Sequence, residues 1–159
     1  MPDANAFRIS AHTVPPAALC SAMSDLWVAA WSRAMPGIDF EARRPWLLQR
    51  IGEWPLVLTL DGEAGDLLGF ALLDPHRQWL DQIAVAPAAH GSGAASRLLD
   101  EVKARCGACV GLDVNADNHR AVAFYRREGF VAGATGTNPN SGLPVVRMRW
   151  TQNVSAPDR

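Results

Sequence analysis

The loop Ala89-His90-Gly91-Ser92-Gly93-Ala94-Ala95 has the composition of an anion-binding turn. Its small residues follow a predicted strand and open a predicted helix. Such a turn lets several backbone N–H groups approach a phosphate closely, and the first turn of the helix adds unpaired donors at the positive end of its dipole. Successive N–H groups of this kind form a cradle for phosphate oxygens. A glycine-rich turn before a helix also occurs for purely structural reasons, so the loop alone supports both interpretations.

Two well-known phosphate loops do not fit this segment. A nucleotide P-loop needs Lys and then Ser or Thr after its last glycine, whereas Ala94 and Ala95 follow Gly93. A dinucleotide-binding turn needs three spaced glycines and an acidic residue at the end of the next strand. Asp113 stands at a suitable distance, but the glycine spacing is absent. If the loop binds phosphate, it does so as a site of another kind.

Hydrophobic periodicity predicts strands and helices on both sides of the loop. The predicted strands cover residues 7–12, 56–60, 67–73, 79–85, 110–114, 130–134 and 145–150. The predicted helices cover residues 17–34, 40–51, 92–105 and 118–128. In the last of these helices Asn118 suits the N-cap position and Gly129 lies just past the end. Strands and helices alternate only in part, which indicates an α/β or α+β fold with a mixed sheet.

Length and composition indicate one soluble, globular domain. The 159 residues are 48% apolar and 19% charged, which suffices for a sizeable core. We expect a single domain over residues 1–150 and a polar tail over 151–159. The net charge of −1, from 15 basic and 16 acidic residues, argues against a nucleic-acid partner.

The same composition predicts a cytoplasmic protein with no membrane partner. The N-terminal residues contain no apolar signal-peptide core, and no run of about 18 apolar residues exists. The three cysteines, Cys20, Cys106 and Cys109, are too few for a disulfide framework. Cys106 and Cys109 form a lone C-x-x-C without the further ligands that zinc needs. We therefore expect no metal and interpret this segment as a turn between a helix and a strand.

Two motifs follow one another within residues 79–130. His90-Gly91-Ser92-Gly93-Ala94-Ala95 comes after Val85-Ala86-Pro87, and Asn118-His119-Arg120-Ala121-Val122-Ala123-Phe124-Tyr125 precedes Gly129-Phe130. This part of the chain resembles the GNAT superfamily of acyl-CoA-dependent N-acyltransferases. The family's cofactor loop reads Arg/Gln-x-x-Gly-x-Gly/Ala after a Val-x-Pro turn, and its next motif reads Asn-x-x-Ala-x-x-Phe/Leu-Tyr and then Gly-Phe. His90 departs from the family's Arg or Gln, and a neutral His brings less charge to the phosphates.

The resemblance implies a GNAT-like fold and acetyl-CoA as the acetyl donor. In that fold a central mixed, largely antiparallel sheet of about six or seven strands contains a splayed parallel pair and is flanked by about four helices. The pantetheine arm would lie between the strands at 79–85 and 110–114. The implied cofactor-binding residues are Ile83, Ala84, Val85, His90, Gly91, Ser92, Gly93, Ala94, Ala95, Ser96, Asn118 and Tyr125.

The implied reaction is N-acetylation of a primary amine, on a small molecule or an exposed peptide amino group, by direct attack in a ternary complex. Tyr125 occupies the family's acid position, where it would protonate the leaving thiolate, and it is the only tyrosine in the chain. Its alternative interpretation is a half-buried helix tyrosine with a satisfied hydroxyl. Members of this family are often dimers, so a homodimer is one option for the oligomeric state.

Asp81 is the preferred catalytic base. An alkyl ammonium group has a pKa of about 10, so a base must remove a proton before the amine can attack. In related families a base can lie at either of the two positions matching 79 and 81, and position 79 is Trp here. Strand alternation predicts that Trp79, Asp81 and Ile83 share one face. The alternative is a carboxylate that only pairs with a nearby Arg or faces water. Asp113 is a weaker candidate.

Two segments are candidates for the acceptor pocket. Asn138 and Ser141 belong to a long connection before the last strand, and such loops often border the acceptor in this family. Trp27 and Trp31 lie one helical turn apart and are expected either in the core or as an aromatic wall for an apolar or cationic amine.

Two other functions stay open. The chain could be an acyl-CoA-binding or sensing domain with weak catalysis, which the presence of both Tyr125 and Asp81 disfavours. It could also resemble toxin-like enzymes that acetylate aminoacyl-tRNA, which the net charge of −1 disfavours.

Overall fold

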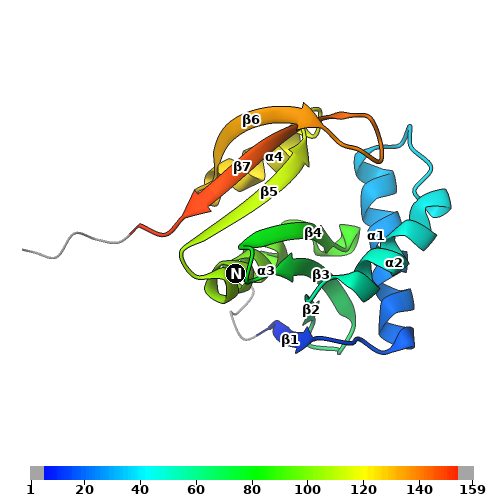
Figure 1. Cartoon of the computed structure of the whole chain (residues 1–159). Helices are drawn as coiled ribbons and strands as arrows, with labels where there is room; N and C mark the ends of the chain where they lie inside the picture. The colour runs from blue at the N-terminus through cyan, green and yellow to red at the C-terminus, as the bar shows by residue number, and fades with distance from the viewer. Residues whose placement is uncertain (1–5, 154–159) are drawn as a thin grey trace, which may run out of the picture.

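The computed structural model describes residues 6–153 and contains one seven-stranded sheet in the order β1-β2-β3-β4-β5-β7-β6 (Figure 1). All neighbouring strands are antiparallel except β4 and β5, which are parallel. The strands are β1 (Arg8–His12), β2 (Leu56–Asp61), β3 (Leu67–Asp74), β4 (Trp79–Val85), β5 (Cys109–Asn115), β6 (Val131–Thr137) and β7 (Pro144–Thr151). The helices are α1 (Ala17–Ala34), α2 (Arg44–Glu53), α3 (Ala94–Cys106) and α4 (His119–Arg127), with short 3-10 turns η1 (Glu41–Arg43) and η2 (Pro87–Ala89). The expected mixed, largely antiparallel sheet with four helices is confirmed.

The two faces of the sheet bury separate hydrophobic clusters. Because side chains alternate along a strand, Phe70 and Leu72 of β3 pack under α1 and α2, whereas Ala71 and Leu73 pack under α3. All four side chains are fully buried. The helices therefore cover both faces of the sheet around β3.

The parallel strands β4 and β5 pair at a single point and then diverge. The register has one pair, Trp79 opposite Gly111, and the Gly111 N–H donates to the Gln78 carbonyl at 2.9 Å. A Cβ at Gly111 would lie 2.9 Å from the Trp79 ring, so glycine is needed where the strands meet. Beyond this point the backbone edge of β4 that faces β5 is left without a partner strand. The expected splayed pair is thus present (Figure 1).

A β-bulge interrupts β4 at Asp81. Leu73 pairs with Leu80 and Leu72 pairs with Gln82, which leaves Asp81 as the extra residue. As a result Asp81 and Gln82 both contact helices on the α1/α2 face, while Ile83 packs against the opposite cluster. The prediction that Asp81 and Ile83 share a face is wrong, because simple alternation does not continue through a bulge.

Most element bounds agree with the sequence pattern. The helix at 17–34 and the strand at 79–85 have the predicted bounds. The single helix predicted at 40–51 is instead η1 followed by α2. Pro45 explains the break, because it has no N–H to donate to the preceding turn. The tail predicted at 151–159 lies outside the described residues from 154 onward. Within residues 6–153, no helix combines the length and apolar character that crossing a membrane requires.

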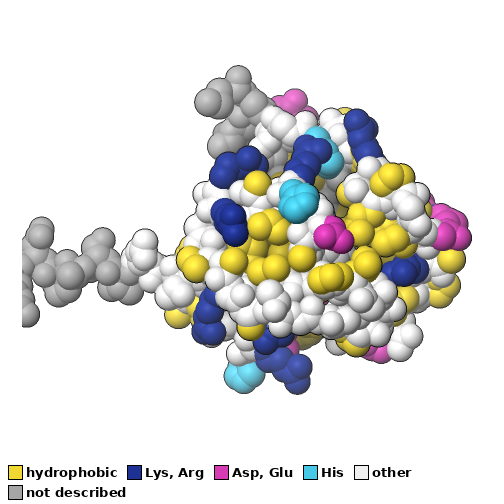
Figure 2. All heavy atoms as spheres, turned by 90° about the horizontal axis from the view of Figure 1, so that it is seen from above, with side chains coloured by type: hydrophobic (Ala, Val, Ile, Leu, Met, Phe, Trp, Pro, Cys, Tyr) yellow, Lys and Arg dark blue, Asp and Glu magenta, His cyan; other side chains and the backbone are white. Residues whose placement is uncertain are grey.

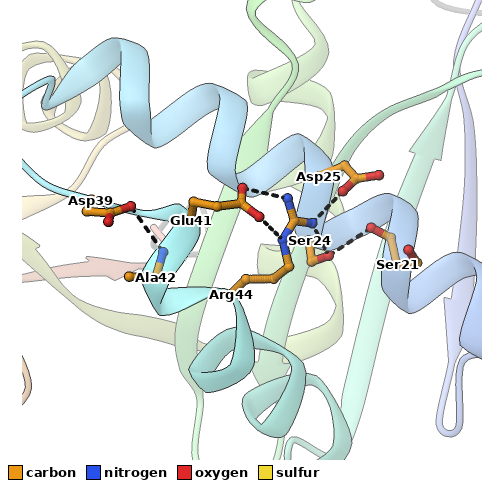
Figure 3. A network of polar contacts seen from close by, with 7 residues as sticks. All are labelled: Ser21, Ser24, Asp25, Asp39, Glu41, Ala42 and Arg44. Atoms are coloured by element: carbon orange, nitrogen blue, oxygen red, sulfur yellow. Dashed lines mark hydrogen bonds and ion pairs between the residues drawn. The ribbon is translucent and has the colours of Figure 1, made fainter.

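A polar network fixes η1 and α2 against α1 (Figure 3). The Arg44 guanidinium donates to both carboxylate oxygens of Glu41, at 2.9 and 2.8 Å. It also donates to Asp25 and, at 2.8 Å, to the buried hydroxyl of Ser24, which in turn donates to the Ser21 carbonyl. Arg44 therefore links the start of α2 to the middle of α1.

Candidate active site

A cavity of about 1070 Å³ opens where β4 and β5 diverge. Its walls come from α1, η1, α2, β4, β5, the loop before α3, the first turn of α3, α4 and the β6–β7 connection. Sixteen of the seventeen predicted site residues line it: Trp27, Trp31, Asp81, Ile83, Ala84, Val85, His90, Gly91, Gly93, Ala94, Ala95, Ser96, Asn118, Tyr125, Asn138 and Ser141. Ser92 is the exception. The structure thus brings residues from both halves of the chain to one cavity.

The loop before α3 presents unpaired backbone donors. Gly91 and Gly93 have φ of 79° and 87°, a conformation that favours glycine, and a Cβ at either would meet no atom within 4 Å. Within residues 6–153, the N–H groups of Gly91, Gly93, Ala95 and Ser96 make no hydrogen bond. These donors lie at the N-terminus of a 13-residue helix. The loop therefore has the open space and the donors that an anion needs.

Ser92 holds the shape of the loop. Its hydroxyl donates to the Ala89 carbonyl and accepts from the Ala94 N–H at 3.3 Å. The side chain is therefore used within the turn, which explains why Ser92 does not line the cavity.

Positive charge near the loop comes from residues other than His90. Burial and the nearby guanidinium groups of Arg120 and Arg33 lower the pKa of His90, against a raising contact with the Val85 backbone. The imidazole is therefore neutral at neutral pH. Both arginines line the cavity. Neither arginine was predicted as a site residue. Arg120 lies inside the motif that begins at Asn118, whereas no local sequence pattern indicates a role for Arg33.

Ser96 joins the two helices that border the loop. Its hydroxyl donates to Glu128 Oε1 at 2.6 Å, and Lys103 Nζ donates to the Glu128 carbonyl at 2.7 Å. The start of α3 is thereby tied to the end of α4. Only the backbone N–H of Ser96 is left to bind a ligand.

Tyr125 reaches the cavity from α4. The Asn118 side chain accepts from the Ala121 N–H at 3.2 Å, so its predicted N-cap role is confirmed. The Tyr125 ring is buried and meets Phe130 edge-on at 5.5 Å. Within residues 6–153 the Tyr125 hydroxyl has no hydrogen-bond partner. Every fully buried polar side-chain atom in these residues does have a partner, so the Tyr125 oxygen is not fully buried and is exposed to the cavity. Burial raises the pKa of Tyr125, which keeps the phenol protonated.

Asp81 is held by an arginine from α2. Arg50 Nε donates to Asp81 Oδ2 at 3.1 Å and Arg50 Nη2 to Oδ1 at 2.8 Å. The Arg50 guanidinium also lies 5.2 Å from the Trp46 ring and 5.7 Å from the Trp54 ring. Burial raises the pKa of Asp81, and the contacts with Arg50 and Gln82 oppose that rise. The alternative expected for Asp81, a carboxylate paired with a nearby arginine, is therefore present. No sequence pattern identified Arg50 as that arginine.

Four aromatic rings form the wall of the cavity below α1 and α2. Trp27 and Phe40 meet edge-on at 5.3 Å, Trp31 stacks on Phe40 at 5.7 Å, and Trp46 lies 6.0 Å from Trp27. Trp27 Nε1 donates to Gln82 Oε1 at 3.2 Å, which fastens the wall to β4. Trp27 and Phe40 are almost fully buried, whereas Trp31 and Trp46 are half-buried. Both interpretations of Trp27 and Trp31, core and cavity wall, therefore apply in part.

The β6–β7 connection lies beside the end of α1 (Figure 1) and closes the cavity on that side. Asn138 Oδ1 accepts from the N–H groups of Asn140 and Ser141, at 2.9 and 3.3 Å. The Ser141 hydroxyl accepts from the Leu143 N–H at 3.2 Å. These side chains give the loop its shape, and the same residues line the cavity. Figure 2 shows, on one face of the molecule, hydrophobic side chains gathered beside Lys, Arg and His.

The C-x-x-C segment forms the turn between α3 and β5, as predicted. Cys106 and Cys109 are both buried and free. Within residues 6–153, no group of three or more His, Cys, Asp or Glu side chains is arranged to hold a metal ion.

Several solved structures share this fold. The apo form of YjaB from Escherichia coli superposes with a TM-score of 0.76 at 18% identity, over 90% of this chain and 97% of that one. The ribosomal-protein-S18-alanine N-acetyltransferase from Escherichia coli gives 0.64 at 18% identity, over 96% and 99%. Ard1 from Thermoplasma volcanium gives 0.68 at 21% identity, over 92% and 97%. At these identities the likeness shows the fold alone.

A search of the curated proteins finds no match to the sequence. Residues 17–130, in contrast, match the family model described as the acetyltransferase (GNAT) family. This match covers most of the chain, including α1, the splayed strands, the loop before α3 and the helix that carries Tyr125. The protein belongs to the GNAT family of acetyltransferases.

Proposed function

We propose that the protein transfers an acetyl group from acetyl-CoA to a primary amine, by direct attack in a ternary complex. One observation carries the proposal. A single cavity brings together the unpaired N–H groups before α3, the Tyr125 hydroxyl and the Asp81 carboxylate. None of these groups alone would support the proposal; their presence in one cavity does.

The residues present fit coenzyme A. Open space above Gly91 and Gly93 and four unpaired N–H groups suit the pyrophosphate. The nearby guanidinium groups of Arg33 and Arg120 add the positive charge that a neutral His90 does not supply. The unpaired edge of β4, from Ile83 to Val85, offers backbone groups to the amides of the pantetheine arm.

Asp81 and Tyr125 divide the proton transfers. Acetyl-CoA supplies a thioester whose carbonyl carbon bonds to the amine nitrogen while the carbon–sulfur bond breaks. The Asp81 carboxylate takes a proton from the amine, directly or through a water molecule, and the raised pKa of Asp81 makes it a stronger base than an exposed carboxylate. Arg50 orients that carboxylate. The Tyr125 hydroxyl gives a proton to the departing sulfur. In this step Asp81 therefore gains one proton and Tyr125 loses one.

The Asp81→Asn variant tests the role of Asp81. It keeps the shape of the side chain and one of the two oxygens that accept from Arg50, but it cannot take the proton. We expect the rate of coenzyme A release at neutral pH to fall by about a hundredfold, while acetyl-CoA still raises the melting temperature. Unchanged turnover in Asp81→Asn would contradict the assignment of the base.

One observation favours a second function. The two-point contact between Arg50 and Asp81 stabilises the ionised carboxylate and weakens it as a base. An acyl-CoA-binding domain without turnover would have this arrangement. It would show thermal stabilisation by acetyl-CoA and no coenzyme A release with any amine.

A further inference from the structure

The cavity has two chemically different ends. His90, Arg33 and Arg120 lie together at the end that borders the phosphate loop, since both arginines act on the imidazole. The other end is bounded by the aromatic rings of α1 and α2, by Phe40 just before η1 and by the β6–β7 connection. Asp81 lines the same cavity and is tied to α2, so the reacting amine must approach from the aromatic end.

The aromatic end offers flat apolar surface to a ligand. Trp31 and Trp46 are half-buried and line the cavity, while Trp27 and Phe40 support them from behind. Aromatic ligands pack well against such rings in stacked or edge-on geometry. An acceptor that left these rings in water would forgo much of the binding energy that the site provides.

The acidic residues of the cavity are already paired. Asp81 is bound by Arg50, and Asp113 is bound by Arg147 at 3.0 and 3.2 Å. These are the only Asp or Glu residues that line the cavity among residues 6–153. A polyamine or a lysine-rich peptide is bound best by several free carboxylates, which pair with its extra positive charges. The cavity therefore disfavours a polycationic acceptor.

Arg43 supplies a positive charge at the aromatic end. Its guanidinium lies 5.9 Å from the centre of the Phe40 ring, and the residue lines the cavity. Within residues 6–153 it forms no ion pair. A guanidinium group in this setting suits a carboxylate, which it can bind through two parallel hydrogen bonds.

We propose that the acceptor is an aromatic α-amino acid, whose ring packs on Trp31 and Trp46, whose carboxylate binds Arg43 and whose α-amine faces Asp81. The inference rests on the proposed function and narrows its substrate class. The α-nitrogen forms a bond to the acetyl carbonyl carbon as the carbon–sulfur bond breaks. The α-ammonium group loses two protons in all; one is balanced by protonation of the sulfur, and the other is released to solvent.

Four amines separate the contributions of ring and carboxylate. Coenzyme A release is measured with the full chain at saturating acetyl-CoA and with L-phenylalanine, phenethylamine, L-alanine or spermidine. Phenethylamine lacks only the carboxylate of phenylalanine, and alanine lacks only its ring. We expect kcat/KM for L-phenylalanine to exceed that for each of the others by at least about tenfold, since a charged hydrogen bond or a buried ring contributes that much.

Two arginine variants test the carboxylate contact. Arg43→Gln should reduce the preference for L-phenylalanine over phenethylamine by about tenfold. Arg77→Gln changes an exposed arginine outside this cavity and should keep the preference. Preference for spermidine or phenethylamine, an equal effect of Arg43→Gln on both aromatic amines, or turnover of other amines but not phenylalanine would overturn the substrate class and leave the proposed function standing. A protein that neither binds acetyl-CoA nor acetylates any amine would overturn both.

Discussion

The phosphate end and the aromatic end of the cavity are built by different means. The phosphate end uses the backbone of one short segment, from His90 to Ser96, and its geometry depends on two glycines and a helix N-terminus. The aromatic end uses side chains from α1, η1, α2 and β4 that meet only in the folded chain. A backbone site depends little on the identity of its side chains, whereas a side-chain site is specified residue by residue. Under the proposed function, the first end would bind acetyl-CoA and the second would select the acceptor amine.

The largest effect is expected from a substitution that disrupts the phosphate end. Gly93→Glu places a carboxylate among the N–H donors, where it competes with the pyrophosphate and repels it. We expect kcat/KM for acetyl-CoA to fall by at least about a hundredfold, because juxtaposed like charges cost several kcal/mol.

Gly65→Glu is the matched control. Gly65 also has a positive φ, of 81°, and a Cβ there also meets no atom within 4 Å, but it lies in the β2–β3 turn. Both variants therefore carry similar backbone strain. Equal losses of activity in the two would mean that strain, not phosphate binding, explains the effect.

A smaller effect is expected from a substitution at Tyr125, between the two ends, which tests proton donation separately from acetyl-CoA binding. Tyr125→Phe keeps the ring contacts with Phe124 and Phe130 and removes the hydroxyl. We expect kcat to fall by about a hundredfold, the usual contribution of a general acid, with little change in melting temperature or in KM for acetyl-CoA. Steady-state kinetics at several acetyl-CoA concentrations would measure both constants. An unchanged kcat would assign Tyr125 to packing.

The smallest effect is a shift in pH dependence. Arg50 lowers the pKa of Asp81, against the rise that burial causes, so Arg50→Gln should raise this pKa further. The base acts only when ionised, and activity is therefore lost as the pH falls through its pKa. We expect the acid limb of the kcat/KM profile to move to higher pH in Arg50→Gln and to stay in place in Arg77→Gln. A limb that moves to lower pH, or not at all, would contradict the role of Asp81.

The sequence predicted the phosphate end better than the aromatic end, for a physical reason. The loop geometry, the Asn118 cap and the position of Tyr125 depend on residues within a few positions of one another, so local patterns contain the information. The strand and helix order followed from periodicity in the same way.

The rest depends on contacts between distant segments. The bulge at Asp81 requires knowledge of how β3 and β4 pair, and it reverses the expected face. Arg50 is 31 positions from Asp81 in sequence, and Trp27 is 55 positions from Gln82. Arg33 and Arg43 became candidates only when the cavity showed them beside the phosphate loop and the aromatic wall. No local pattern distinguishes these arginines from solvated ones.

The most direct test of the account is the melting temperature of the full chain with and without about 1 mM acetyl-CoA. A dissociation constant of about 10 μM would stabilise the folded state by about 2.7 kcal/mol, which corresponds to a rise of about 5 to 10 °C for a domain of this size. We expect a rise of that size, and we expect Gly93→Glu to abolish it and Gly65→Glu to keep it. No rise with either acetyl-CoA or free coenzyme A would mean that the loop before α3 does not bind the donor, and the acetyltransferase mechanism described for this cavity would be wrong.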